Sequence, residues 1–144
     1  MESTTPDPID AVTRRRMQQQ RRTGTGPEMR IRRALHRAGW RYRVDRPVLE
    51  GDRRRRADIV FPRLGVAVFV DGCFWHGCPE HATAPHNNKA WWQAKIAANR
   101  RRDRDTDSRL ADQGWIAVRV WEHEDVDVAI RRIVEVLEAR KPTR

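Results

Sequence analysis

The stretch ADIVFPRLGVAVFVD, residues 57–71, decides the fold of this chain. Its two apolar runs, Ala57–Phe61 and Val66–Val70, are separated by a turn that contains proline and glycine. Short runs rich in β-branched and aromatic residues, bounded by such turns, predict two adjacent buried strands. Because Val66–Val70 is almost wholly apolar, we expect it to be the central strand, covered on both faces.

Asp58 interrupts the first of these strands with a carboxylate. A charge in an apolar strand is costly unless it meets a cation or leaves the core at the strand end. A hard divalent ion such as Mg²⁺ would suit it. The alternative is an aspartate that caps the strand against a neighbouring arginine.

The flanking sequence predicts helices and strands in the order α-β-β-β-α-β-α. Capping and glycine signals bound two of the helices, and alternating apolar residues mark the remaining strands. The predicted elements are a helix from Pro27 to Ala38 ended by Gly39, an alternating segment Trp40–Val44, a helix from Lys89 to Gln113 ended by Gly114, a strand Trp115–Trp121, and a last helix marked by Ile130, Ile133, Val134 and Leu137. This order predicts an α/β fold with a mixed central sheet flanked by helices.

Composition limits the chain to one core. With 144 residues, 38% hydrophobic and 35% charged, we expect a single domain over residues 23–144 behind a flexible basic arm, residues 1–22. No apolar run approaches the roughly 18 residues of a membrane span, and the N-terminus lacks the pattern of a signal peptide. We therefore expect a cytoplasmic protein with no membrane partner.

Charge indicates the binding partner. The formal net charge is +10, and it is carried mostly by arginine in clusters such as Arg14–Arg16 and Arg100–Arg104. The arginine fork of donors matches phosphate geometry, so nucleic acid is the expected partner. A basic surface that is merely solvated is the alternative.

A cysteine and histidine cluster follows the second strand. Cys73, Cys78 and His81 form a C-x4-C-x2-H pattern, which offers three zinc ligands within nine residues. His123 is the expected fourth ligand and His86 the competing one; unligated buried thiols are the alternative. Four protein ligands would make the zinc structural, because no position remains open for water.

Aromatic residues lie inside this predicted zinc knuckle. Phe74 and Trp75 could stack on bases or wedge between them, or they could instead cover the zinc and fill the core. The strand-turn-strand with an acid on its first strand resembles the restriction-endonuclease-like core. The acid and lysine that the second strand of that core normally carries are missing here. Asp71 is the only acid on that strand, and His76 is the nearest candidate base.

Four motifs together resemble the very-short-patch repair endonucleases of the Vsr type. They are RADIVFP at residues 56–62, DGCFWHGCPEH at 71–81, WW-x2-KI-x2-N-x3-D at 91–103 and VRVWEHE at 118–124. The resemblance implies a restriction-endonuclease-like fold with a structural zinc. It also implies a Mg²⁺-dependent enzyme, a monomer, that nicks double-stranded DNA 5′ to the T of a T:G mismatch, the product of 5-methylcytosine deamination.

The resemblance also implies roles for individual residues. Asp58 would bind Mg²⁺ together with the main-chain carbonyl of Val70. His76 would act as general base, oriented by Asp103, and Glu28 would fix metal-bound water. The DNA contacts implied in the same way are intercalation by Phe74, Trp75 and Trp92, a minor-groove wedge by Met17, mismatch contacts from Lys95 and Asn99, and an arm that embraces the duplex and includes Arg14 and Arg21.

Two positions depart from the family pattern. Position 71 is Asp where some members carry a second His, and Gly24 replaces an expected charged residue in the arm. The second change leaves the flanking sequence preference open, because base contacts set specificity. Two other readings remain: a restriction-associated nuclease with another DNA specificity, and a zinc-stabilised DNA-binding module without catalysis.

Overall fold

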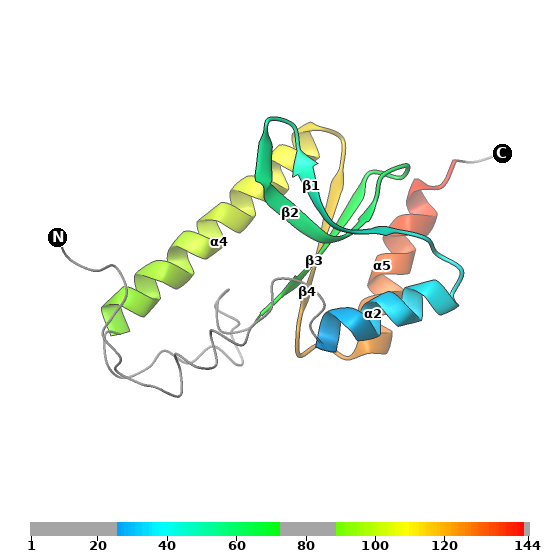
Figure 1. Ribbon diagram of the computed structural model, residues 1–144, viewed down its shortest axis with the longest axis horizontal. Coiled ribbons are helices and arrows are strands. Elements are labelled where there is room, and N and C mark those ends of the chain that lie inside the picture. Colours follow the sequence, from blue (N-terminus) through cyan, green and yellow to red (C-terminus); the bar gives the residue numbers. More distant parts are fainter. Residues whose placement is uncertain (1–25, 73–88, 143–144) are drawn as a thin grey trace.

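The computed structural model describes residues 26–72 and 89–142. Within these ranges, helices and strands follow one another in the order expected from the sequence (Figure 1). The elements are α2 (Gly26–Arg37), β1 (Arg43–Leu49), β2 (Asp52–Phe61), β3 (Val66–Asp71), α4 (Lys89–Asp112), β4 (Ile116–Trp121) and α5 (Val126–Arg140).

The four strands form one mixed sheet in the order β1-β2-β3-β4. The β1–β2 and β2–β3 pairs are antiparallel, and β3 runs parallel to β4. The strand β3 therefore has a partner on each side, and Val66–Phe69 is buried, as expected of a central strand. The α/β class with a mixed, helix-flanked sheet is confirmed.

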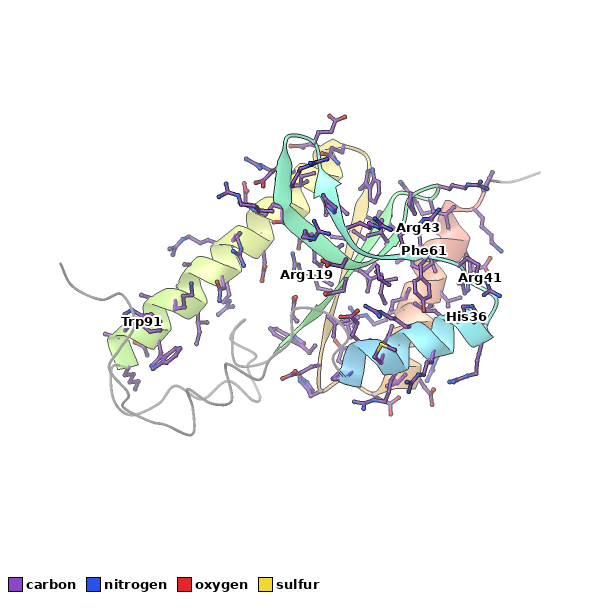
Figure 2. All side chains as sticks on the ribbon, in the orientation of Figure 1. His36, Arg41, Arg43, Phe61, Trp91 and Arg119 are labelled. Atoms are coloured by element: carbon purple, nitrogen blue, oxygen red, sulfur yellow. The ribbon has the colours of Figure 1, made fainter. Side chains whose placement is uncertain are left out.

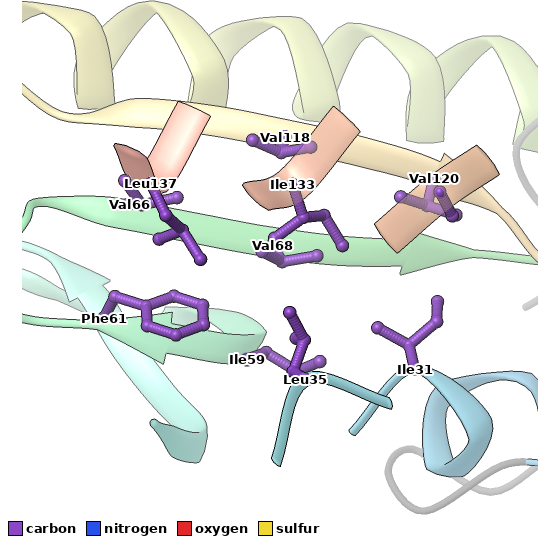
Figure 3. Close-up of a cluster of buried hydrophobic side chains, with 11 residues drawn as sticks. Ile31, Leu35, Ile59, Phe61, Val66, Val68, Val118, Val120, Ile133 and Leu137 are labelled. Atoms are coloured by element: carbon purple, nitrogen blue, oxygen red, sulfur yellow. The ribbon is translucent and has the colours of Figure 1, made fainter. Parts of the chain in front are cut away.

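One face of the sheet packs against α2 and α5. Ile31 and Leu35 from α2 and Ile133 and Leu137 from α5 meet the strand residues of this face in one buried cluster (Figure 3). Each of these four side chains is at most 2% exposed. Their spacing of three to four residues along each helix is the apolar stripe that the sequence pattern predicted.

The other face packs against the C-terminal half of α4. Leu110 is fully buried there against strand residues that include Ala67 and Phe69. Gln113 fastens the β1–β2 hairpin beside it, because its side chain donates to the Val48 carbonyl (3.0 Å) and accepts from the Glu50 amide (3.0 Å). The N-terminal half of α4 extends beyond the sheet (Figure 1).

Glycines end two helices, at the positions the sequence indicated. Gly39 and Gly114 have positive φ values of 96° and 80°, the left-handed conformation that favours glycine. The residue after each one, Trp40 or Trp115, donates its amide to a carbonyl five residues earlier, at 3.0 and 2.8 Å. This is the Schellman arrangement, which satisfies carbonyls at the end of a helix.

The first two strands are longer than predicted. The arginine run Arg53–Arg56 was expected to separate the strands, but it lies within β2 and pairs with β1 as far as Leu49 and Asp52. Contacts of Arg55 stabilise this run as a strand, because its guanidinium is directed toward α4 and contacts Asp105 (3.0 Å) and Thr106 (2.7 Å). Strand pairing and docking to the helix both stabilise a segment whose composition suggested a loop.

Several predictions fall outside the described residues. They concern the basic arm with Met17, Arg14 and Arg21, and the predicted zinc knuckle with Cys73, Phe74, Trp75, His76, Cys78, His81 and His86. Across residues 26–72 and 89–142, no helix is long and apolar enough to cross a membrane.

Candidate active site

Asp58 lies where the pairing between β2 and β3 ends. The last pair of this ladder is Ile59 with Val68. At the next residue, Asp58, the side-chain carboxylate takes the place of a main-chain partner and accepts a hydrogen bond from the main-chain N–H of Val70 at 2.7 Å. Asp58 therefore lies within β2, one residue beyond the last β2–β3 pair, and its carboxylate is fixed against the backbone of β3.

This carboxylate is hard to ionise. The pKa of Asp58 is raised from 3.8 to about 7, mainly by burial and in addition by the negative charges of Glu28 and Asp71. The Val70 hydrogen bond and the charge of Arg32 oppose the rise without cancelling it. A carboxylate with so large a shift, caused by burial and like charges, is typical of a functional site.

Glu28 reaches the site from the first turn of α2. Its carboxylate is 1% exposed and forms an ion pair with Arg32, one turn along the same helix. Tyr42 fixes this turn, because its hydroxyl donates to the Arg32 carbonyl at 2.8 Å. Glu28 lies close enough to Asp58 for its charge to raise the pKa of that carboxyl.

Asp71 lies at the end of β3 and is bound to Arg119 of β4. One guanidinium nitrogen of Arg119 is 3.1 Å from each Asp71 oxygen. The same side chain contacts Asp107 at 2.8–3.0 Å and Asp103 at 3.5 Å, both on α4. Arg119 therefore links two neighbouring strands to the long helix (Figure 2).

The pKa of Arg119 lies above its ordinary value. Burial lowers it, but the hydrogen bonds to Asp107 and the charges of Asp71, Asp103 and Asp107 outweigh that effect. The guanidinium is also 4.1 Å from the centre of the Phe69 ring, a cation–π contact. Arg119 consequently remains a cation in this position.

The helix α4 carries the remaining predicted residues on one stripe. Trp92, Lys95, Asn99 and Asp103 are three or four residues apart, so they lie along one side of the helix. Trp92 and Asn99 are buried and Lys95 is exposed. The stripe begins in the core at Leu110 and passes Asp103 beside the Arg119 cluster before it reaches the end of α4 beyond the sheet.

The donor chemistry around Asp58 fits a magnesium ion. Mg²⁺ keeps several of its waters and binds through one or two carboxylates and a substrate phosphate, so it needs few protein ligands. In residues 26–72 and 89–142, no three acidic, histidine or cysteine side chains have the geometry of a metal site. A partly buried carboxylate near other negative charges, such as Asp58, is still stabilised in its ionised form when a cation binds to it.

The zinc prediction has one residue in the described part of the chain. His123 follows β4 and is exposed. Its expected partners Cys73, Cys78 and His81 are outside the described ranges, as is the candidate base His76. The zinc site and the general base therefore stay predictions.

Sequence reasoning missed the two arginines that organise the acidic groups. Arg119 lies in IAVRVW, where alternation places it on the same face of the sheet as α4, and Arg32 lies four residues after Glu28. A charged residue on the inward side of a strand was the available signal, since such a position requires a partner.

The comparison with known families decides the identity of this arrangement. The model of the family DNA mismatch endonuclease Vsr matches residues 7–81, just over half of the chain. This chain belongs to the Vsr family. The matched segment contains Glu28, Asp58 and Val70, the residues that converge at the β2–β3 end.

Individual relatives of this Vsr family member cover more of its length. A type II nicking enzyme of Lentzea aerocolonigenes, V.NaeI, is 44% identical over 93% of this chain and 81% of its own. The type II nicking enzyme V.XorIIP of Xanthomonas oryzae is 41% identical over 78% of this chain and 80% of its own. The DNA mismatch endonuclease Vsr of Escherichia coli K12 is 35% identical over 68% and 61% respectively.

Proposed function

We propose that this protein is a Mg²⁺-dependent nicking endonuclease that hydrolyses one strand of duplex DNA 5′ to the T of a T:G mismatch. Membership of the Vsr family supports a DNA endonuclease. The observation that carries the proposal within the molecule is the placement of Asp58, a partly buried carboxylate near Glu28 and Asp71 where the pairing of β2 with β3 ends.

Asp58 holds the metal in this proposal, together with the Val70 carbonyl. The bound Mg²⁺ supplies Lewis-acid activation of the scissile phosphate and charge stabilisation of the leaving oxygen. Val70 keeps the Asp58 carboxylate in a fixed orientation through its amide. Glu28, anchored by Arg32, orients water at the site and adds negative charge that favours a cation.

His76 takes the proton of the attacking water in this proposal. A neutral imidazole near pH 7 is suited to that task. Asp103 orients the imidazole from α4, where Arg119 and the helix backbone fix its position. The proton thus moves from water to the imidazole, and the leaving group is the 3′ oxygen of the preceding nucleotide.

Recognition of the mismatch is assigned to aromatic and polar residues. Phe74, Trp75 and Trp92 intercalate, while Lys95 and Asn99 face the T:G pair from α4. Because Trp92 and Asn99 are buried in the DNA-free structure, this proposal requires both side chains to become exposed when DNA binds. A mismatched pair costs less to unstack than a matched one, which favours wedging at that step. The arm with Met17, Arg14 and Arg21 surrounds the duplex and supplies phosphate contacts.

A structural zinc completes the proposal. Cys73, Cys78 and His81 hold it with His123 as fourth ligand, or with His86 in its place. His123 lies two residues after the end of β4 and is exposed, so its side chain is not part of the hydrophobic core. The metal stabilises a segment whose sequence offers little core of its own.

A second candidate function is nicking of a different DNA target. The names of the relatives from Lentzea and Xanthomonas, type II nicking enzymes, support a strand-specific nuclease and say nothing of a mismatch. The same Asp58 chemistry would serve both candidates. The substrate therefore separates them, and the catalytic residues do not.

The experiment that tests the chemistry compares Asp58→Ala with Asp112→Ala, an exposed carboxylate near the end of α4. Each variant is assayed for nicking of a T:G duplex with Mg²⁺ and for binding of the same duplex with EDTA. We expect Asp58→Ala to lose at least a thousandfold in nicking rate and to keep its DNA affinity within about threefold, because only the metal ligand is lost. Asp112→Ala should behave like the unmodified protein. Equal nicking by both variants would remove Asp58 from the mechanism.

A further inference from the structure

The proposed chemistry uses Arg119 only as an anchor for Asp103, and it gives no role to the contact between Arg119 and Asp71. Its side chain is enclosed between β3, β4 and α4 and is 21% exposed. It contacts carboxylates from two of these elements, Asp71 on β3 and both Asp103 and Asp107 on α4. An arginine held between three acids on two elements fixes their relative positions, because its planar fork can bind several oxygens at once.

Asp71 is the carboxylate whose position matters most for the metal site. It directly follows Val70, whose amide binds Asp58, and its charge already raises the pKa of Asp58. A carboxylate free to turn at the end of β3 would be a second ligand for any cation at Asp58. In the structure both Asp71 oxygens are instead directed to one nitrogen of Arg119 at 3.1 Å.

The surroundings of Arg119 keep it in that orientation. The Phe69 ring lies against the guanidinium at 4.1 Å, and Asp107 accepts from the opposite side of the fork at 2.9 and 3.0 Å. The main-chain carbonyl of Arg119 accepts from Arg132 of α5 at 2.7 Å. Contacts therefore hold both the backbone and the guanidinium of Arg119. A movement of the guanidinium toward Asp58 would break its hydrogen bonds with Asp107.

We propose that Arg119 is a positioning residue for DNA cleavage: it neutralises Asp71, keeps it out of the metal site, and fixes Asp103 on α4 relative to β3. This inference rests on the proposed function for the identity of the site. It assigns a role to Asp71, which stands where some family members carry a histidine. Asp58 then remains the single carboxylate that holds the cation.

The test uses Arg119→Gln and a matched control, Arg55→Gln. Arg55 is also a partly buried arginine, 20% exposed, that ties a strand to α4 through Asp105 and Thr106, but no contact joins it to Asp71. Both variants lose an anchor of α4, so a purely structural effect should be similar in the two. Only Arg119→Gln removes the contact between Arg119 and Asp71.

The decisive readout is Mg²⁺ binding to the DNA-free protein. It is measured at pH 8 as the rise in Tm when MgCl₂ is added. Release of Asp71 adds negative charge and a ligand beside Asp58, so we expect Arg119→Gln to reach half-saturation at an at least threefold lower Mg²⁺ concentration. Its single-turnover nicking of a T:G duplex should fall at least tenfold, with DNA affinity within threefold. Arg55→Gln should leave both Mg²⁺ binding and nicking within threefold of the unmodified protein.

A double variant distinguishes the effect of the Asp71 charge from a general loss of structure. The double variant Arg119→Gln/Asp71→Asn removes the released charge, and its Mg²⁺ half-saturation should return to within twofold of the unmodified protein. Unchanged or weaker Mg²⁺ binding by Arg119→Gln would overturn the inference, as would equal loss of nicking in Arg119→Gln and Arg55→Gln. Absence of T:G nicking by the unmodified protein would defeat the proposed function, while the Mg²⁺ titration would still decide the role of Arg119.

Discussion

Replacing Asp58 by Asn should make the metal-free protein more stable. The pKa of Asp58 is 3.8 in the unfolded chain and about 7 in the folded protein, so the folded state binds the Asp58 proton more tightly. The contribution of Asp58 to stability is therefore fully present below about pH 4 and is lost as pH rises through about 7. A pKa difference of about three corresponds to about 4 kcal/mol as an upper limit, and residual hydration of the carboxylate reduces this to about 2–4 kcal/mol. The amide of Asn carries no charge and can still accept from Val70.

The assay is urea unfolding of both proteins in EDTA at several pH values from 4 to 8, with Asp112→Asn as a control at an exposed site. We expect Asp58→Asn to exceed the unmodified protein by about 2–4 kcal/mol at pH 8 and by less than about 1 kcal/mol at pH 4. Asp112→Asn should stay within about 0.5 kcal/mol throughout. Added Mg²⁺ should stabilise the unmodified protein at pH 8 and leave Asp58→Asn unchanged. An Asn variant that is no more stable at pH 8 would refute the electrostatic account of the site.

Three further predictions concern other parts of the molecule. Cys78→Ser should lower bound zinc, measured by atomic emission, together with Tm, and full zinc occupancy in that variant would rule out the proposed ligand set. Glu28→Gln should lower the pKa of Asp58, since the Glu28 charge contributes to its rise; a pH dependence of unfolding identical to that of the unmodified protein would contradict this. Ile133→Ala, which truncates a fully buried side chain of α5, should cost about 2–5 kcal/mol in urea unfolding, and a cost below about 1 kcal/mol would mean that this contact is not part of the core.

Most of the fold was predictable because its signals are local. The glycines at positions 39 and 114 end helices through a backbone conformation that few other residues adopt, and the apolar run 66–70 has the composition of a strand buried on both faces. The arginine run 53–56 misled the prediction for a physical reason. Arg55 is stabilised by Asp105 and Thr106, which are about fifty residues away in the sequence and brought near only by the fold.

The candidate site was predictable in part. Asp58 could be recognised from sequence alone, because an acid in an apolar strand requires a partner, and Glu28 and Asp103 followed from the family resemblance. Alternation in strand β4 indicated an inward charge at Arg119, but its partners could not be predicted. They depend on the parallel pairing that places Arg119 beside Phe69 and on the face of α4 that meets β4, and both bring together residues far apart in the sequence.

The measurement that tests the central claim most directly is a strand-resolved nicking assay with Mg²⁺. Two end-labelled duplexes that differ only in T:G or C:G at one position are compared across several flanking sequences. The account predicts a single cut, 5′ to the mismatched T, in the T:G duplex and no cut in the C:G duplex. Cutting of both duplexes, or of both strands, would contradict mismatch-specific nicking and favour a nuclease with another DNA target.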